Sequence, residues 1–395
     1  MAAGTIRGPI TGLAFRLVLP RRLVPLACGL AALATTGAAV TASLSGQSWD
    51  TTSLVRMHAD LGIAKLAVYD DPDFRLRRAA GYYDGAFFYA IARDPIATGQ
   101  AHELLDEAPY YWGHPGYGWL AWLASGGGHP RVLPDALLAV SLICVFAAGW
   151  TASLLARELG WTPWGGLAVA LNPGLVYAVA ADTSEPLGTA LLLAALLGYV
   201  RNRVGWTIGL LAALCLVKEP LVLVPLAIGA WELWRRRRPP LVVLSVIPAA
   251  VWWLYVRIHL GSFPFGHGTS RLAQPFVGWY HGLLDAVSQS WSEAADTAQL
   301  GQTAVPLIVV TGLAIIVAAI YALRLRNVVH PSYLALAALY ACITSKGVQY
   351  PKDLIRELAP LLTLLPFAFL AAGERPGYAS RASASSSRST SAAVL

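Results

Sequence analysis

The chain has 395 residues, of which 56% are hydrophobic and only 13% are charged, and its mean hydropathy is +0.55. A soluble domain carries about twice that share of charged residues, so the composition excludes an ordinary soluble protein and indicates a membrane protein. The net charge of +7 does not indicate a nucleic-acid partner, because the basic residues form short clusters beside apolar segments. The sequence also contains no G-x-G-x-x-G or P-loop motif for a nucleotide.

Apolar segments of bilayer length recur along the chain and predict its topology. The first segment follows several arginines, which the positive-inside rule places in the cytoplasm. About ten spans are predicted, near residues 23–44, 132–156, 162–181, 184–200, 206–218, 219–234, 240–258, 303–323, 331–345 and 354–372. The predicted fold class is therefore all-α, a polytopic bundle of transmembrane helices.

This topology divides the chain into parts. A cytoplasmic segment, 1–22, precedes the membrane domain, 23–372, and a tail rich in Ser, Ala and Arg, 373–395, is too polar to bury a core and is expected to be disordered. Two long external loops, 46–131 and 259–302, interrupt the membrane domain, and loops of this length usually carry function. Both termini would be cytoplasmic, and the plasma membrane is the expected location.

The segment 81–95 in the first external loop is rich in aromatic residues. Tyr83, Phe87 and Ile91 recur every four residues and would share one face of a helix. Tyr89 adds an amphipathic ring of the kind enriched at membrane interfaces. The pattern predicts a short helix that lies in the outer interface and ends before the proline of this segment.

Asp84 would stand at the start of this helix, and two interpretations are open. An aspartate there commonly caps the free N–H groups of the helix. A carboxylate beside aromatic rings at the bilayer surface is also suited to accept the proton of a sugar hydroxyl.

Asp182 and Glu185 lie between two predicted spans. Their i to i+3 spacing would place both carboxylates on one face if the helix extended back to Asp182. The segment 182–186, Asp-Thr-Ser-Glu-Pro, is equally typical of a simple helix start, because Ser or Thr often precedes the first turn and Pro fits within it.

Lys218 and Glu219 interrupt the apolar stretch 204–234. A charge at the centre of a membrane helix costs about 2.5–3.5 kcal/mol on insertion scales, so it commonly marks a functional site. The part before Lys218 is too short to cross the bilayer, which predicts a broken helix opening onto a cavity. Alternatively, the two side chains simply pair with each other or with Asp182 or Glu185.

A cluster of charges near the last span contains Lys346, Lys352 and Arg356, together with Asp353 and Glu357. Arg356 follows Lys352 by four residues and should point the same way on a helix. Arg and Lys side chains are suited to stabilise a departing phosphate as its negative charge develops.

Six short motifs occur in an order that resembles a known family. They are YDG at 83–85, FYxIAxDP at 88–95, YxxxHPxY at 110–117, NPG at 172–174, DxxEP at 182–186 and KE at 218–219. Over about residues 20 to 235 the chain is similar to bacterial GT-C-type integral membrane glycosyltransferases, and most similar to the mannosyltransferases that use polyprenyl-phosphate sugars. The resemblance implies a GT-C-like helical fold with a catalytic acid in the first external loop, and Asp84 is the residue that matches.

Two details qualify this resemblance. Members that mannosylate proteins carry an Asp-Glu pair where this chain has Asp84 and Gly85, which disfavours a protein acceptor. Asp71-Pro72-Asp73 resembles the D-x-D of metal-dependent oligosaccharyltransferases, although the cluster with Asp70 also fits a solvated turn. No cofactor is required by this interpretation, and a divalent metal at the Asp-Pro-Asp segment is the alternative that the pattern leaves open.

The sequence therefore predicts an inverting glycosyltransferase that moves a hexose or pentose from a polyprenyl-phosphate donor to a glycan or lipid acceptor on the external face. Asp84 would be the general base. The residues predicted to hold the donor phosphate or line the cavity are Lys218, Glu219, Asp182, Glu185, Lys346 and Arg356, and those predicted to line the substrate are Tyr83, Tyr89 and His114.

Two other functions compete with this prediction. A transporter or lipid flippase would use Lys218 and Glu219 as a charged site at the membrane midplane. A catalytically inactive envelope scaffold could have the same fold, because a fold does not determine its chemistry.

Overall fold

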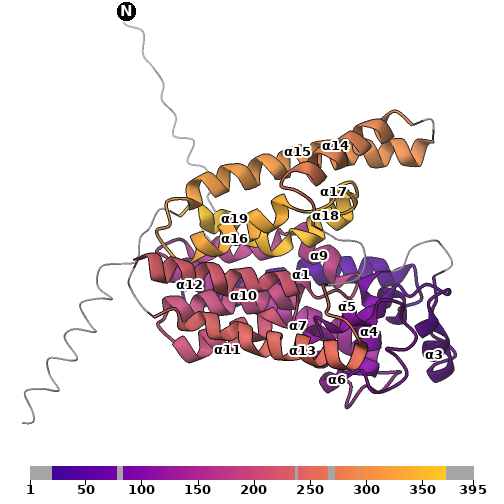
Figure 1. The fold of residues 1–395 in the computed structure, drawn as a ribbon. Coiled ribbons are helices and arrows are strands. Elements are labelled where there is room, and N and C mark those ends of the chain that lie inside the picture. Colours follow the sequence, from indigo (N-terminus) through magenta and orange to yellow (C-terminus); the bar gives the residue numbers. More distant parts are fainter. Residues whose placement is uncertain (1–19, 78–82, 236–238, 266–271, 293, 371–395) are drawn as a thin grey trace, which may run out of the picture.

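The computed structural model describes residues 20–77, 83–235, 239–265, 272–292 and 294–370. Within these ranges the chain forms helices and turns without a β-strand, which confirms the predicted all-α class (Figure 1). The predicted tail lies outside the described residues, as does the predicted cytoplasmic segment apart from residues 20–22.

Among the described residues, four helices are long and apolar enough to cross a membrane. They are α1 (Val24–Ser45), α7 (Leu133–Glu158), η3 continued by α13 (Leu241–Val246 and Ile247–Leu260) and α15 (Ala295–Ala322). A crossing needs about 20 residues, and these helices have 22, 26, 20 and 28. They indicate a helical membrane protein, but fewer helices reach spanning length than the predicted topology requires.

Breaks in the backbone explain why other predicted spans are short. The predicted span 162–181 is divided into η1 (Pro163–Gly166), α8 (Leu167–Ala170) and α9 (Pro173–Val179). Proline has no N–H to continue a helix, so each proline begins a new element. The Asn172 side chain then accepts hydrogen bonds from the N–H groups of Gly174 and Leu175 and caps α9.

The predicted break at Lys218 and Glu219 is confirmed. The helix α10 (Glu185–Val200) leads into α11 (Val204–Cys215), which has 12 residues and ends before Lys218. Glu219 begins the short η2 (Glu219–Val222), and α12 (Leu223–Arg235) follows it.

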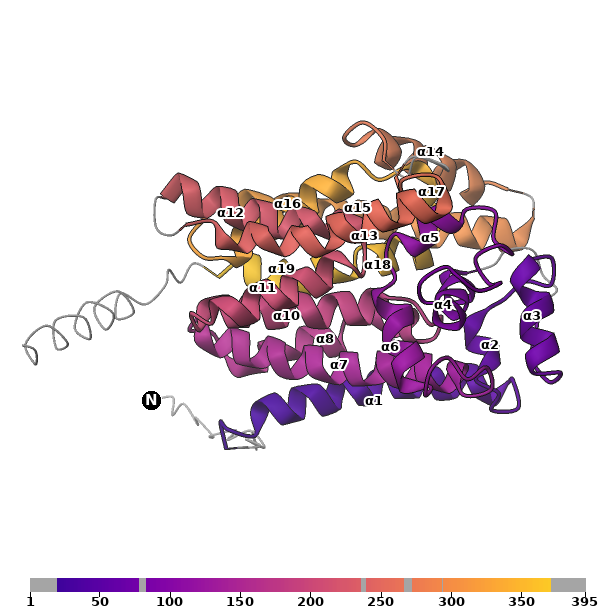
Figure 2. The ribbon, with the colours of Figure 1, turned by 60° about the horizontal axis from the view of Figure 1, so that its bottom comes forward.

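The described part of the first predicted loop contains five short helices, which gather at one end of the long helices (Figure 2). They are α2 (Thr52–Val55), α3 (Gly62–Asp70), α4 (Asp84–Arg93), α5 (Ala108–Trp112) and α6 (Gly116–Ala124). The predicted bounds of α4 are confirmed, because it starts at Asp84 and ends at Arg93.

The predicted interfacial position of α4 is wrong. Every residue from Gly85 to Ala92 is buried, because α2, α5, α6 and α7 pack around the helix. The side chain of Ile91 lies against Gly118 of α6. The aromatic and small residues of α4 therefore pack within the protein rather than lying along the lipid surface.

The C-terminal part adds a second layer of helices. The helix α14 (Val277–Ser290) packs along α15, and both begin inside the segment predicted as the second external loop (Figure 1). The remaining helices are α16 (Val329–Ala341), α17 (Ser345–Val348), α18 (Pro351–Glu357) and α19 (Ala359–Ala368). The short helices α17 and α18 bring residues 345–357 toward the first loop.

Candidate functional site

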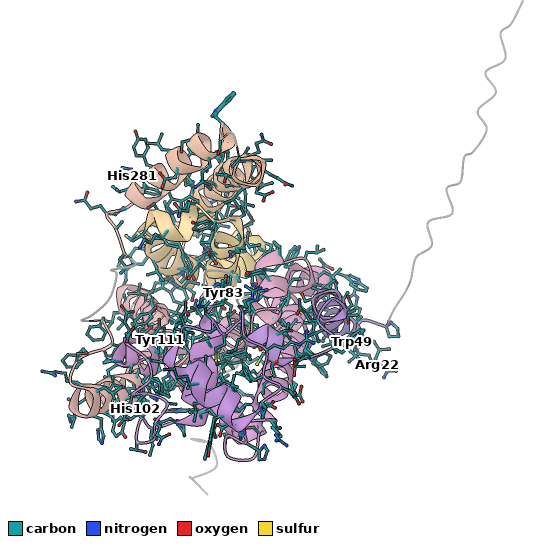
Figure 3. All side chains as sticks on the ribbon, turned by 90° about the vertical axis from the view of Figure 1, so that its right-hand side faces the viewer. Arg22, Trp49, Tyr83, His102, Tyr111 and His281 are labelled. Atoms are coloured by element: carbon teal, nitrogen blue, oxygen red, sulfur yellow. The ribbon has the colours of Figure 1, made fainter. Side chains whose placement is uncertain are left out.

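A polar cavity of about 1080 Å³ lies where the first loop meets the C-terminal helices. Tyr83, Asp84 and Phe87 contribute its wall from the start of α4. The opposite wall comes from α17 and α18 and includes Lys346 and Arg356. Viewed from the loop end of the molecule, Tyr83 lies centrally, between the yellow C-terminal helices and the purple first loop (Figure 3).

Arg356 joins three carboxylates at this wall. Its Nη1 donates a hydrogen bond to Asp84 Oδ2 and lies 3.3 Å from Glu185 Oε1. Its Nη2 donates to Glu357 Oε1 at 3.1 Å. The Arg356 side chain is only 5% exposed and that of Glu185 only 1%, whereas that of Asp84 is 24% exposed. Asp84 is therefore the member of the network that a ligand in the cavity can reach most directly.

Lys218 completes the network from behind the cavity wall. Its Nζ donates to Glu185 Oε1 at 2.6 Å and lies 3.6 Å from Glu357 Oε2. The break after α11 gives Lys218 an extended backbone, and this turns its side chain toward the start of α10. The predicted alternative that Lys218 pairs with Glu185 is thus confirmed, and the pair is part of the network that contains Asp84.

Close backbone packing positions both halves of the network. A Cβ atom at Gly85 would lie 2.8 Å from Val55 O and 2.9 Å from Ala181 O, so Gly85 lets the start of α4 approach the two neighbouring segments. A larger residue has no room here, which gives a structural reason for the Asp84-Gly85 sequence in place of an Asp-Glu pair.

The Asn-Pro-Gly motif at 172–174 fixes the helices that carry Arg356. Asn172 Nδ2 donates to Ala359 O at 2.8 Å and to Thr363 Oγ1 at 2.9 Å. A Cβ atom at Gly174 would collide with the carbonyl oxygen of Ile355. Ile355 directly precedes Arg356 in α18. The contact between Gly174 and Ile355 therefore determines where the Arg356 guanidinium meets the cavity.

Tyr83 is surrounded by cations. The guanidinium carbons of Arg356 and Arg56 lie 4.9 Å and 5.3 Å from the centre of its ring, and Lys352 Nζ lies 5.6 Å away. The predicted common direction of Lys352 and Arg356 is confirmed by their shared position at this ring. Burial raises the pKa of Tyr83, so its hydroxyl stays protonated and donates to Asp353.

Aromatic and acidic groups complete the cavity wall. Phe87 and Tyr111 stack with ring centres 3.5 Å apart and planes 14° apart. Further carboxylates in the wall belong to Asp60, Glu103, Asp106, Glu107 and Asp353. Aromatic faces and carboxylate acceptors together suit a polyhydroxylated ligand, because the rings cover its C–H faces and the acids accept from its hydroxyls.

A second, apolar groove of about 750 Å³ runs between α14, α15 and α16. Trp279, Leu283, Ile308 and Leu313 are among the side chains that line it. One of its walls reaches Cys342, only two residues before Thr344, which lines the polar cavity. The linker between α16 and α17 therefore separates a groove suited to hydrocarbon from the charged cavity.

The structure brings together many of the residues predicted for the site and separates others. Asp84, Glu185, Lys218 and Arg356 form one ion-pair network. Lys346 and Tyr83 also line the cavity.

Six predicted site residues do not line the cavity. Lys218 and Glu185 join its network from behind the wall, and the other four lie apart from it. Glu219 pairs with His114 at 2.8 Å, and neither residue lines the cavity. The Tyr89 side chain is fully buried and packs edge-on against Phe74, because the helix turn directs it away from Phe87. Neither Tyr89 nor His114 lines this cavity, contrary to the prediction that both line the substrate.

Asp182 also takes a position that its spacing did not predict. The helix α10 begins at Glu185 and does not extend back to Asp182, which has a left-handed φ of 47°. Its carboxylate is fully buried, and neither oxygen has a hydrogen-bond partner in the described part of the chain. Burial raises the pKa of Asp182 well above its usual value, so the neutral acid is the favoured form.

The Asp-Pro-Asp segment does not form a metal-binding arrangement. Asp71 Oδ1 accepts a hydrogen bond from the Asp73 N–H at 3.3 Å, as in a solvated turn, and Asp70 pairs with Arg93 at 2.6 Å. Within the described ranges, no group of three His, Cys, Asp or Glu side chains is arranged to hold a metal ion.

Glu357 and Arg56 contact the network or the Tyr83 ring but were not among the residues predicted for the site. Glu357 contacts both Arg356 and Lys218, and its place next to Arg356 in the sequence was the available signal. Arg56 contacts the Tyr83 ring, but it lies in a loop without periodicity and no local pattern indicates its direction.

Comparison with known proteins finds no matching family model and no similar curated protein.

Proposed function

We propose that the protein is an inverting membrane glycosyltransferase that uses a polyprenyl-phosphate sugar and acts on a glycan or lipid acceptor of the cell envelope. The observation that carries the proposal is the pairing of Asp84 with buried Arg356 on the wall of a polar cavity. A carboxylate and a fixed cation side by side are the two groups that such a transfer requires, one for the acceptor proton and one for the leaving phosphate.

The proposed reaction is a single displacement. Asp84 takes the proton of an acceptor hydroxyl, whose oxygen forms a bond to the anomeric carbon as the bond from that carbon to the phosphate oxygen breaks. The electron pair leaves with the polyprenyl phosphate, and Arg356 and Lys346 stabilise its charge from the cavity wall. The ion pair with Arg356 holds the Asp84 carboxylate at the cavity wall, where an acceptor hydroxyl can reach it.

The apolar groove between α14, α15 and α16 supports a lipid-linked donor. Its aliphatic and aromatic walls suit a polyprenyl chain, and its end near Cys342 lies close in sequence to Thr344 and Lys346 of the cavity. A chain in this groove would present its phosphate toward the cations of the cavity.

The transporter alternative has less support. Lys218 is paired with Glu185 and Glu357, and Glu219 is paired with His114. A midplane transport site would need these charges to be available to a substrate, whereas here they fix the broken helix beside the cavity.

The test is sugar transfer by purified protein in proteoliposomes, with radiolabelled polyprenyl-phosphate mannose or arabinose and cell-envelope acceptors. Asp84→Asn is expected to lower transfer by at least about 100-fold, the scale of a lost general base, while the protein remains folded. Asp296→Asn is the matched control, because Asp296 is also an acid in the first turn of a helix but is exposed on α15.

Unimpaired transfer by Asp84→Asn would overturn the proposed role of Asp84. Labelled donor that crosses the vesicle membrane without transfer would instead support a flippase.

A further inference from the structure

A third hollow, of about 430 Å³, lies on the outside of the bundle between α1 and the α8–α9 segment. Ala39 and Ser43 line it from the last two turns of α1, and Leu171 and Val176 line it from the other side. Leu171 is 77% exposed. Since α1 is one of the helices of spanning length, a hollow beside its final turns lies at the level where hydrocarbon meets lipid headgroups.

Arg56 and Tyr177 form the polar end of this hollow. Arg56 Nη1 donates to Tyr177 Oη at 2.5 Å and Arg56 Nη2 donates to Ala180 O at 3.1 Å. A guanidinium has five N–H donors, so these bonds fix its position and leave further donors for a ligand. Arg56 also holds a left-handed φ of 52°, a conformation that is uncommon for residues other than glycine.

Two more cations stand near Arg56. Partial desolvation and the positive charge of Arg56 lower the pKa of Arg77. Lys352 lies beside the same Tyr83 ring as Arg56. Among the described residues, no carboxylate forms an ion pair with Arg56, Arg77 or Lys352.

Unbalanced like charges of this kind repel one another, and an anion bound between them relieves the repulsion. Of the nearby acids, Asp353 accepts the hydrogen bond of Tyr83, and Asp182 is fully buried. An anionic ligand beside Arg56 would complement this cluster, because Arg56 itself has no paired carboxylate among the described residues.

We propose that this hollow is a binding site for a membrane lipid with a phosphate headgroup, whose phosphate is held by Arg56, while Arg77 and Lys352 add positive charge nearby. Arg is well suited to phosphate because its planar N–H groups match two phosphate oxygens. The apolar walls formed by α1 and Leu171 accept the start of the lipid chain. The hollow shares no lining residue with the polar cavity, and the Tyr83 ring is contacted by both Arg56 and Arg356.

Native mass spectrometry of the detergent-solubilised full chain tests the proposal by titration with phosphatidylglycerol. Diacylglycerol with the same chains and inorganic phosphate are the two comparison ligands. Arg56→Gln is expected to weaken phosphatidylglycerol binding by roughly 10-fold or more. Lys65→Gln, an exposed lysine of α3 in the same loop, is the matched control and should bind as the unmodified chain does.

Two further variants keep the test decisive if Arg56→Gln unfolds. Lys352→Gln removes an exposed charge and should weaken binding by a few-fold. Ala39→Phe should fill the hollow and block the lipid without changing any charge.

Equal binding by the unmodified chain and both charge variants would overturn the proposal. Diacylglycerol binding as tightly as phosphatidylglycerol, or inorganic phosphate binding as tightly as the lipid, would do so as well. Binding is measured without donor or acceptor, so its outcome is independent of the proposed transferase activity.

Discussion

At the scale of single residues, the site depends on two buried charges, Arg356 and Glu185, that are paired with each other and with partly buried partners. Asp84, Glu185 and Glu357 share the cations Arg356 and Lys218. Removing one partner of such a network leaves a buried charge uncompensated, which costs far more than the loss of an exposed pair. The network therefore also stabilises the fold. A transfer assay alone cannot distinguish loss of this stabilisation from loss of a catalytic group.

Arg356→Gln is expected to lower the free energy of unfolding by about 3–5 kcal/mol, because it leaves Glu185 and Asp84 without their shared cation. Denaturation in mixed micelles measures this value. Arg201→Gln is the control, since Arg201 pairs with Glu158 at a partly exposed position and should cost about 0–1 kcal/mol. Equal losses for the two variants would contradict a cooperative buried network.

Asp182 makes the stability of the folded protein depend on pH, and the direction of the effect follows from its raised pKa. Its pKa is raised by burial in the folded state, so the stability that protonation contributes is complete below pH about 4 and is lost as the pH rises through the folded pKa. Thermal melting of the unmodified chain and of Asp182→Asn between pH 5 and 9 measures the difference between them. We expect the variant to gain relative stability as the pH rises, and a constant difference would show that Asp182 does not titrate in this way.

At the scale of elements, short helices carry the site and packing holds them in place. The helix α18 has only seven residues, too few for stability in isolation. Its position depends on α9, through the Asn172 hydrogen bond to Ala359 and the close approach of Gly174 to Ile355. A motif far from α18 in the sequence thus places Arg356.

Gly174→Ala should therefore push α9 away from α18 and cost about 1–3 kcal/mol of stability, the range for overpacking. Under the proposed function, transfer should fall as Arg356 moves with α18. Gly209→Ala is the control, because a Cβ atom there meets no other atom within 4 Å and alanine favours an exposed helix. If Gly174→Ala changed neither stability nor transfer, the α9–α18 contact would not determine the position of Arg356.

At the scale of the whole molecule, the long helices and the first loop divide the protein into a membrane part and one polar end. The residues that line the cavity come from both halves of the chain, and the first loop meets α17 and α18 at that end (Figures 1 and 2). The proposed orientation places this end outside the plasma membrane and both termini in the cytoplasm.

Cysteine labelling in intact cells tests this orientation. A cysteine at Lys65 on α3 should react with a membrane-impermeant maleimide, whereas a cysteine at Arg157, at the other end of α7, should react only after the cells are opened. Both positions are exposed, and Cys28, Cys144 and Cys215 are buried, which limits background labelling. The reverse pattern would invert the proposed topology.

Local features of the sequence determined much of this protein. Hydropathy predicted the helical membrane class, and the run of charge and proline at 218–220 predicted the broken helix. Asp84 and the proline after Asp94 predicted the ends of α4. These features depend on side-chain solubility and backbone hydrogen bonding over a few residues, so they can be read without knowledge of the fold.

Only the tertiary structure decided which charges meet. Asp84 and Arg356 are 272 residues apart, and periodicity shows which side chains share a face but not which neighbour that face contacts. The same reason explains why Tyr89 is buried away from the cavity and why Arg56 reaches Tyr83. The sequence by itself determined a membrane helix bundle with polar breaks, whereas packing at one end of that bundle selected Asp84, Glu185, Lys218 and Arg356 as one site.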